Sequence, residues 1–418
     1  MRMSGQVRER EDLIMLTGPS AGEMLRTALM TMGYPAIVRS WSVHSIHHRP
    51  GAGVTVGYAL TIDRIEPAGE QIRTEEYMCA STARISQQDT PGLVHLTSQE
   101  TGVWVWRYPG DPELPALRLA CSPAEMTALL GEPVSVELMS YRPTRRAVVR
   151  VRGATSVSYA KVARPPQVDS LAKRHMMLSV AGVCAPPVLM HDPRGLLVIG
   201  SAEGVPLSTL ISRGMGQMAL PMLTSLTGLL DSLPPQALSL SHRPAWADRS
   251  KHYAHAAATA LPQQRMRCEA LARGIVELLA RSDPGPLVPV HGDFYEANIF
   301  VAAREPRVTG IIDVDSLGPG HRVDDWACLL GHMSVLPHLA PQSYPHVGDD
   351  LPVWRGVCET MVDPVALCAR TAGVVLSLVA GAKRVDGSEW RGDALGRLAT
   401  AEAWLARAYQ HASAKPPF

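Results

Sequence analysis

The residues best suited to chemistry lie in one polar interruption of an apolar region, VHGDFYEANIFV at 290–301. The interruption contains Asp293, followed five positions later by Asn298, and the next apolar segment ends at Asp313 in IIDVDS. Transfer of a phosphoryl group needs a carboxylate near the incoming hydroxyl and oxygen ligands that hold Mg²⁺. Asp293 is the candidate for the first task, and Asn298 and Asp313 are the candidates for the second.

The same spacing occurs in the catalytic and metal loops of protein kinases. This chain has His-Gly-Asp in place of His-Arg-Asp, and Ile-Asp-Val-Asp in place of Asp-Phe-Gly. With these motifs and VTGIIDVDSLGPGHRVDDWACLLGHM at 308–333, the chain resembles the aminoglycoside phosphotransferase and choline kinase-like family, less sharply over about 134–418. The resemblance implies a protein-kinase-like fold, ATP or GTP as phosphoryl donor, Mg²⁺ as cofactor and a small-molecule hydroxyl as acceptor.

The resemblance also implies roles for residues beyond the metal and base candidates. In the family, the His of the motif and the carboxylate before the later helix brace the loop, which makes His291 and Asp325 structural supports. A lysine on the third strand holds the α- and β-phosphates. Lys161 in SVSYAKVAR stands there, with a solvated strand-end lysine as the alternative interpretation. The adenine would lie against the connector after LLVIG, which includes Ile199 and Ser201.

Two features depart from the family pattern. The turn in YRPTRRAVV lacks a glycine, although loops that approach phosphates usually contain one. Arg145 or Arg146 is a candidate for the phosphate contact instead, unless both are exposed strand residues. The helix VDSLAKRHMMLSV contains no Glu to orient Lys161, and Asp169 is its only carboxylate. Either Asp169 or a residue of the N-terminal module takes this role, or the ion pair is absent.

Hydrophobic periodicity predicts an α+β fold in three parts that must position these residues. Residues 1–132 form a small N-terminal α+β module, 133–204 a β-rich kinase-like N-lobe with its hinge, and 205–418 a mainly helical C-lobe. Period-two alternation in VTVGYALTIDRI, SVELMSYR, RRAVVRVRG and SVSYAKVAR predicts strands. Helical periodicity dominates the last part, interrupted by the short β-prone segments around the catalytic candidates.

Two segments of the N-terminal module contain residues that mark the start of a helix or the end of a sheet. Ser20 and Glu23 have the spacing of a capping box, which predicts a helix over 19–33 that ends near Gly33. The tract YPGDPELP at 108–115 contains three prolines and a glycine. It therefore predicts a rigid loop that ends the sheet.

The C-terminal part contains the longest apolar segment, TAGVVLSLVAGA at 371–382. This segment is too short to span a bilayer, which takes roughly 20 residues, so a buried helix is expected. Asp363 followed by Pro364 predicts an N-cap and the first residue of a helix.

Composition favours a cytoplasmic protein without a general affinity for nucleic acids or membranes. The formal net charge is +1, and the N-terminal residues carry charges of both signs without the apolar segment of a signal peptide. The seven cysteines are scattered and never in a Cys-x-x-Cys spacing, which indicates reduced thiols rather than disulfides or a zinc site.

The charge of the helical part bears on the acceptor. Residues 205–281 contain four Asp or Glu against eight Lys or Arg, whereas a pocket for a polycationic aminoglycoside should be acidic. A neutral or anionic hydroxylated molecule is therefore favoured among antibiotics, sugars and other metabolites. Two other functions stay open: a Ser/Thr kinase acting on a peptide, and a nucleotide-binding regulator without catalysis. The sequence leaves the oligomeric state open.

Overall fold

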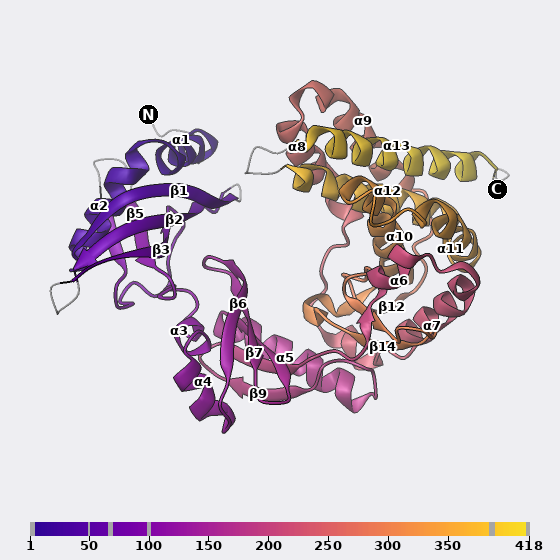
Figure 1. Cartoon of the computed structure of the whole chain (residues 1–418). Helices are drawn as coiled ribbons and strands as arrows, with labels where there is room; N and C mark the ends of the chain where they lie inside the picture. The colour runs from indigo at the N-terminus through magenta and orange to yellow at the C-terminus, as the bar shows by residue number, and fades with distance from the viewer. Residues whose placement is uncertain (1–4, 49–50, 66–69, 98–101, 384–388, 415–418) are drawn as a thin grey trace. The chain divides into compact units, whose positions relative to one another are not determined.

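The computed structural model describes residues 5–48, 51–65, 70–97, 102–383 and 389–414. The chain forms two compact units, one of Met1–Ala172 with Val188–Ser201 and one of Lys173–Pro187 with Ala202–Phe418. The first unit holds the two large sheets and the second is rich in helices (Figure 1). The predicted fold class, a β-rich lobe and a helical lobe preceded by a small α+β module, is confirmed, while the three predicted boundaries stay predictions.

An antiparallel sheet with the strand order β1-β2-β3-β5-β4 forms the N-terminal module. Its strands are β1 (Ala36–His48), β2 (Val54–Ile65), β3 (Gln71–Ser81), β4 (Val94–Thr97) and β5 (Gly102–Arg107). Two helices, α1 (Gly5–Thr17) and α2 (Ser20–Thr31), pack on this sheet (Figure 1). Alternate residues of β2, from Val54 to Ile62, point to one face of the sheet. They are buried there in one core with residues of the two helices.

Two features of this module differ from the sequence predictions. The capping box is wrong, because the N-cap of α2 is Pro19 and the Ser20 hydroxyl donates instead to the main-chain oxygen of Met15 at 3.1 Å. Strand β1 was not predicted. It is an edge strand with one exposed face, so apolar residues such as Ile37 point to solvent and obscure the alternation.

The second sheet of the first unit has the strand order β6-β7-β8-β10-β9. Its strands are β6 (Ser135–Arg142), β7 (Arg146–Arg152), β8 (Val157–Ala163), β9 (Val188–Asp192) and β10 (Leu196–Gly200). One face packs against the short helices α3 (Leu117–Ala120) and α4 (Pro123–Leu130), and α5 (Pro165–Val180) follows β8. Three meandering strands, a helix and two more strands make up the N-lobe that the resemblance predicted.

The predicted rigid loop at 108–115 joins the two sheets of this unit, and Asp111 is its central residue. Asp111 is 2% exposed, and its Oδ2 accepts hydrogen bonds from the Tyr141 hydroxyl at 2.6 Å and the Thr144 N–H at 2.7 Å. Thr144 lies in the turn between β6 and β7 with a φ of +62°. The loop therefore holds the end of β6 and the turn that follows it.

The second unit is mainly helical, as predicted. Its α-helices are α6 (Leu207–Arg213), α7 (Ala219–Asp231), α8 (Ser250–Ala260), α9 (Arg265–Leu279), α10 (Arg322–Leu339), α11 (Val347–Met361), α12 (Pro364–Val379) and α13 (Arg391–Ala414). Helix α12 is central, because it contacts α8, α9, α10, α11 and α13. Its predicted start is confirmed, since the Asp363 carboxylate accepts the N–H groups of Val365 and Ala366.

The apolar segment within α12 is also buried as predicted. By length and composition Pro364–Ala382 is apolar enough to cross a membrane, but 78% of its apolar window is buried inside the protein. That burial is typical of a core helix.

Short strands interrupt the helices and frame the polar segments. A three-stranded sheet has the order β11-β13-β14, and β12 pairs with β15. These strands are β11 (Val205–Pro206), β12 (Leu287–Val290), β13 (Ile299–Val301), β14 (Val308–Ile311) and β15 (Gly318–His321).

Candidate active site

Two loops of the second unit carry the base and metal candidates. We call 291–298, between β12 and β13, the catalytic loop, and 312–317, between β14 and β15, the metal loop. Because β12 pairs with β15 and β13 pairs with β14, the ladders bring the two loops together. The main-chain N–H of Ile312 also donates to the carbonyl of Asn298 at 2.9 Å.

Asp325, in the first turn of α10, holds the catalytic loop by its main chain. Its side chain is fully buried, and its two carboxylate oxygens accept the N–H groups of His291 at 3.0 Å and Gly292 at 2.9 Å. Burial raises the pKa of Asp325 to about 7, although these N–H groups and Arg322 favour the charged form. The carboxylate thereby fixes the two residues that precede Asp293.

His291 links the two loops through its ring. Its Nε2 lies 3.0 Å from the carbonyl oxygen of Ile312, and its Nδ1 lies 3.3 Å from the main-chain nitrogen of Asp293. A carbonyl only accepts and a main-chain N–H only donates, so a neutral ring with its proton on Nε2 satisfies both contacts. These are the contacts that a supporting residue needs.

Asn298 and Asp313 are suited to hold a divalent cation. Asn298 is 4% exposed, and its Nδ2 donates to the main-chain oxygen of Asp293 at 3.0 Å, which leaves its amide oxygen for a ligand. Asp313 directly follows Ile312, which is bonded to Asn298, and has a left-handed φ of +60°. Carboxylate and amide oxygens from neighbouring segments match the hard oxygen ligands that Mg²⁺ takes.

Aromatic contacts anchor the catalytic loop directly after Asp293. Phe294 is fully buried, and its ring meets Trp326 of α10 edge to face, with 6.1 Å between the ring centroids. Tyr295 stacks on His332, also of α10, at 4.2 Å. Burial, aided by Arg397, lowers the pKa of His332 to about 4, so its ring is neutral at pH 7.

The glycine of His-Gly-Asp is required by the metal loop. Gly292 has a φ of +78°, and a Cβ atom at this position would stand 2.8 Å from the main-chain oxygen of Ser316. Both the backbone conformation and the close approach therefore favour glycine. The Ser316 backbone thus lies against the residue that precedes Asp293.

Two arginines at the metal loop were not predicted from the sequence. Arg174 lies in the part of α5 that belongs to the second unit. It is 5% exposed, and its Nε donates to the carbonyl of Leu317 at 3.1 Å. Arg243 is exposed, and its Nη1 donates to the Ser316 hydroxyl at 2.9 Å. Burial and the nearby Arg243 lower the pKa of Arg174, while Asp315 raises it. No spacing motif signals these arginines, because they come from segments distant in sequence.

The four predicted nucleotide-binding residues belong to the first unit. Lys161 of β8 pairs with Leu197 of β10, and Ile199, two residues further along β10, shares that face of the sheet. Ser201 is exposed just after β10, and Arg145 is partly exposed in the turn between β6 and β7.

The carboxylate that the sequence offered for orienting Lys161 has another partner. Oδ1 of Asp169 lies 2.9 Å from Nε2 of His191, and both side chains are exposed. A buried carboxylate of the N-terminal module, Glu113, lies 2.8 Å from the Nε of Arg164, three residues after Lys161.

One sequence comparison matches a part of the chain to a known enzyme family. Residues 191–355 match the model of the phosphotransferase enzyme family, and this segment contains the catalytic loop, the metal loop and Asp325. The resemblance predicted from the motifs is thereby confirmed for this segment. So is the predicted enzyme class, a phosphotransferase with an alcohol group as acceptor. No curated protein matches the chain.

The chain is also similar to solved structures of aminoglycoside phosphotransferases and of a choline/ethanolamine kinase family protein. A thermostable mutant of aminoglycoside phosphotransferase APH(4)-Ia is 15% identical, with 71% of this chain and 100% of that chain covered and a TM-score of 0.48. Its ternary complex with ADP and hygromycin B is 16% identical, with 68% and 98% covered and a TM-score of 0.46. A choline/ethanolamine kinase family protein from Mesorhizobium loti is 16% identical, with 70% and 96% covered and a TM-score of 0.45.

Proposed function

We propose that this protein is an O-phosphotransferase that uses ATP or GTP with Mg²⁺ to phosphorylate a hydroxyl of a small molecule. The observation that supports it best is the shared frame of Asp293, Asn298 and Asp313. They lie on two loops joined by the bond between Ile312 and Asn298 and by the His291 ring. Phosphoryl transfer depends chiefly on positioning and charge stabilisation, which a braced frame of this kind provides.

In the proposed reaction, Asp293 accepts the hydrogen bond of the acceptor hydroxyl. The hydroxyl oxygen forms a bond to the γ-phosphorus, and the bond between the γ-phosphorus and the β–γ bridging oxygen breaks. The hydroxyl proton passes to the Asp293 carboxylate, and the nucleoside diphosphate leaves. A positioned base of this kind contributes roughly 10²- to 10⁴-fold in rate.

We assign Asn298 and Asp313 as ligands of the metal, and His291 and Asp325 as residues that hold the main chain of the catalytic loop. Mg²⁺, when bound, neutralises charge on the phosphates. Asn298 serves two tasks in this proposal, because its Nδ2 donates to the main-chain oxygen of Asp293 and its amide oxygen would hold the cation. His291 and Asp325 keep the loop in the conformation that places Asp293.

The nucleotide is assigned to one face of the β6–β10 sheet. Gly200 pairs with Ser158 near the start of β8, and Arg146 pairs with Ala163 at its end. Lys161 lies between these two positions. We therefore assign the base to the connector of Ile199 and Ser201 and the phosphates to Lys161 and Arg145.

The acceptor is proposed to be neutral or anionic. Arg243 is bonded to Ser316, whose backbone lies against Gly292 of the catalytic loop. Within the described part of the chain, Arg243 has no carboxylate partner. An exposed guanidinium here repels ammonium groups and attracts carboxylate or phosphate groups.

The proposed location is the cytoplasm, and the proposed substrate is a small molecule rather than a nucleic acid or a membrane. All seven cysteines are free thiols, and five of them are buried. Unpaired thiols are usual in a reducing compartment.

The proposal is tested by nucleotide binding and turnover. Thermal stability is measured with ATP and GTP in the presence of Mg²⁺, and nucleotide consumption is then followed over antibiotics, sugars, nucleosides and peptides. We expect a rise in melting temperature with a nucleotide and turnover with a small hydroxylated molecule. Asp293→Asn should lower kcat about 100-fold or more, while Asp349→Asn, on the exposed start of α11, should not.

Each contrary outcome identifies a different error. Absence of any nucleotide shift would reject the kinase assignment. Turnover with peptides alone would favour the peptide kinase, and nucleotide binding without turnover of any acceptor would favour a non-catalytic regulator. Full activity of Asp293→Asn would reject this residue as the base.

A further inference from the structure

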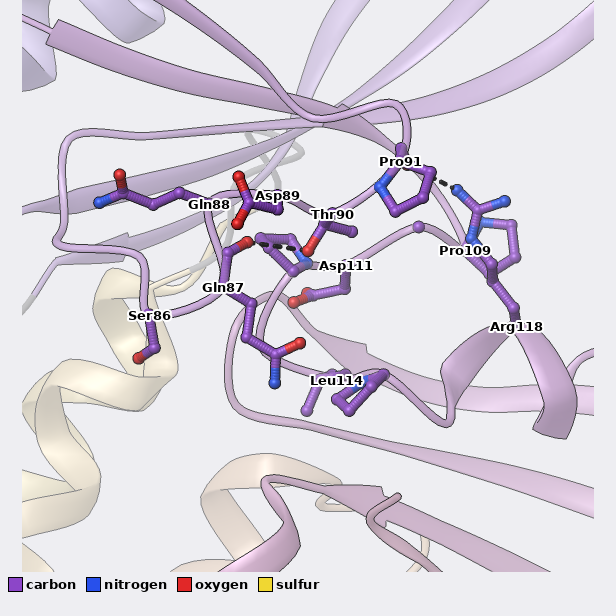
Figure 2. Close-up of a pocket in the computed structure, with 13 residues that line it drawn as sticks. Ser86, Gln87, Gln88, Asp89, Thr90, Pro91, Pro109, Asp111, Leu114 and Arg118 are labelled. Atoms are coloured by element: carbon purple, nitrogen blue, oxygen red, sulfur yellow. Dashed lines mark hydrogen bonds between the residues drawn. The ribbon is translucent and has the colours of Figure 1, made fainter.

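The proline-rich loop at 108–115 has no part in the proposed reaction, yet it forms one wall of a cavity in the first unit. The cavity has a volume of about 550 Å³. Its other walls are the segment 86–91 and Arg118 of α3 (Figure 2). A volume of this size falls within the usual range of small-molecule sites, roughly 300–1,000 Å³.

The walls are held in place by hydrogen bonds between segments. The buried Glu113 accepts from both the main-chain N–H and the hydroxyl of Ser86, which joins the two loops at one end. Arg118 of α3 donates to the main-chain oxygen of Pro91 at 3.1 Å, which joins the segment 86–91 to the helix that follows the proline-rich loop. Prolines at 91, 109, 112 and 115 restrict the backbone further. The cavity is therefore preformed rather than a gap between mobile loops.

Gly110 leaves room for the guanidinium of Arg118 at the rim of the cavity. A Cβ atom on Gly110 would stand 2.5 Å from Nη2 of Arg118, so glycine lets the guanidinium lie over the loop. Figure 2 shows Arg118 beside Pro91 and Pro109, with Gln87, Thr90 and Asp111 around the same space.

The chemistry of the lining favours an uncharged ligand. Arg118 and the exposed Asp89 contribute one charge of each sign. The third ionisable group of the lining is the buried Asp111, whose carboxyl already accepts hydrogen bonds within the protein and whose pKa is raised by burial, which disfavours its charged form. The remaining polar groups include the carboxamides of Gln87 and Gln88 and the hydroxyl of Thr90, which donate and accept hydrogen bonds. Hydroxyl groups of a ligand also do both, and the proline rings offer apolar surface to its carbon atoms. The lining has no excess of either charge, so it would not favour a ligand with a net charge.

Asp111 connects this cavity to the turn that we assign to the nucleotide phosphates. It lines the cavity, and its Oδ2 accepts the N–H of Thr144, the residue before Arg145. Thr144 is in the left-handed conformation, which is unfavourable for a residue with a β-carbon and must be stabilised by such contacts. A ligand that moves Asp111 therefore changes the conformation of the turn.

Charges near the turn also act on the N-terminal module. Burial, together with the positive charges of Arg142 and Arg145, lowers the pKa of His47 in β1 to about 4, which places this strand within electrostatic reach of the turn.

We propose that this cavity is a binding site for a neutral polyhydroxylated molecule, such as a sugar or polyol, and that its occupancy is coupled through Asp111 to the turn of Thr144 and Arg145. The site goes beyond the proposed phosphotransfer, since none of its lining residues belongs to the proposed reaction. Coupling between two sites is reciprocal, so a ligand that strengthens nucleotide binding is itself bound more tightly when the nucleotide is present.

Binding is tested by calorimetry on the full chain without nucleotide. The probes are glucose, sucrose and myo-inositol, with gluconate and glucosamine as the anionic and cationic counterparts of glucose. We expect at least one neutral probe to bind at concentrations up to about 10 mM. Gln87→Ala should weaken that binding about tenfold, because it removes a hydrogen-bonding group from an exposed side chain without disturbing the core. Gly110→Ala should also weaken it by displacing Arg118.

Matched controls separate the cavity from other sites. Gln410→Ala on the exposed face of α13 and Gly356→Ala, where an added Cβ meets open space, should leave the affinity unchanged. Asp293→Asn should also leave it unchanged, which distinguishes this site from a sugar bound as acceptor substrate. No binding by any neutral probe, a preference for gluconate or glucosamine, or full affinity in both cavity variants would each overturn the proposal.

The coupling is tested by hydrogen exchange of the segment 141–146. The Thr144 N–H is bonded to Asp111, so a bound probe should change its protection by about fivefold or more. This measurement needs no nucleotide, so it stands even if the proposed phosphotransfer fails. Unchanged exchange at saturation would overturn the coupling.

Discussion

The Asp325 carboxylate and the main chain of Gly292 form the contact on which the catalytic loop depends, with 2.9 Å between Oδ1 and the N–H nitrogen. Gly292 is held from the other side by the backbone of Ser316, against which a side chain would clash. Because the peptide of Gly292 leads directly to Asp293, this pair of contacts sets the position of the proposed base. Gly292 and Asp325 are 33 positions apart in sequence and meet only in the folded unit.

Asp325→Asn should destabilise the protein and slow turnover together. An amide has one accepting oxygen, so one of the two N–H groups of His291 and Gly292 loses its partner inside the core. We expect a loss of about 1–3 kcal/mol in the free energy of unfolding, measured by denaturant titration at pH 8, where the wild-type group is charged. Asp349→Asn is the exposed control. Stability equal to that of the control would show that Asp325 does not brace the loop.

Asp313→Asn should weaken Mg²⁺ binding without unfolding the chain. Asparagine tolerates the left-handed conformation that Asp313 adopts, so the metal loop should keep its shape. Loss of the negative charge should raise the Mg²⁺ concentration for half-maximal activity about tenfold or more. The first measurement is turnover against MgCl₂, and the second is calorimetry of nucleotide binding with and without the metal. An unchanged Mg²⁺ requirement in both would remove Asp313 from the ligand set.

The parts of the site that could be predicted are those encoded in local spacing. Asp293 and Asn298 share one short loop, and Asp313 ends the next strand but one, so a motif of fixed length contains all three. Strands β2 and β8 were likewise predicted because alternate residues face a core. Local patterns fix such elements before any tertiary contact is considered.

The parts that could not be predicted depend on contacts between distant segments. Arg243 and Ser316 are 73 positions apart, and Asp111 and Thr144 are 33 apart, so no window of sequence contains either pair. The predicted capping box at Ser20 is wrong for a related reason. The chain continues from α1 through Pro19 into α2, and the Ser20 hydroxyl donates to a main-chain oxygen of the preceding helix. Tertiary geometry overrides a local preference worth about 1 kcal/mol.

Lys161→Met should weaken nucleotide binding, and Asp169→Asn should not. A charge-assisted contact to phosphate contributes enough that its loss raises the nucleotide Kd about tenfold or more. Asp169 pairs with His191 at an exposed position, so its neutralisation should change the Kd by less than about twofold. Calorimetry with a non-hydrolysable nucleotide and Mg²⁺ measures both. A large loss in Asp169→Asn would restore this residue as the partner that orients the lysine.

His332 should make the protein sensitive to acid. Its pKa is about 4 in the folded protein and 6.5 when unperturbed, so the unfolded state binds more protons between these values. The stability that the neutral ring contributes is fully present above pH 6.5 and is lost as the pH falls toward 4. His332→Phe preserves a ring against Tyr295 and should reduce the stability difference between pH 7 and pH 5. His255→Phe, at an exposed position of α8, should retain the wild-type difference, and an equal difference in both variants would contradict the assignment.

Arg243→Ala should separate anionic from neutral acceptors. The guanidinium is bonded to Ser316 beside the catalytic loop, where the carboxylate or phosphate of a substrate would gain a charge-assisted hydrogen bond. For an anionic acceptor we expect KM to rise about tenfold with kcat nearly unchanged, since the contact binds the ground state and the transition state alike. For a neutral acceptor KM should stay constant. Arg273→Ala, on the exposed face of α9, is the matched control. If the Arg243 variant instead improves turnover of a cationic acceptor and binds anions as before, the residue excludes ammonium groups without recognising acids, and the acceptor is neutral.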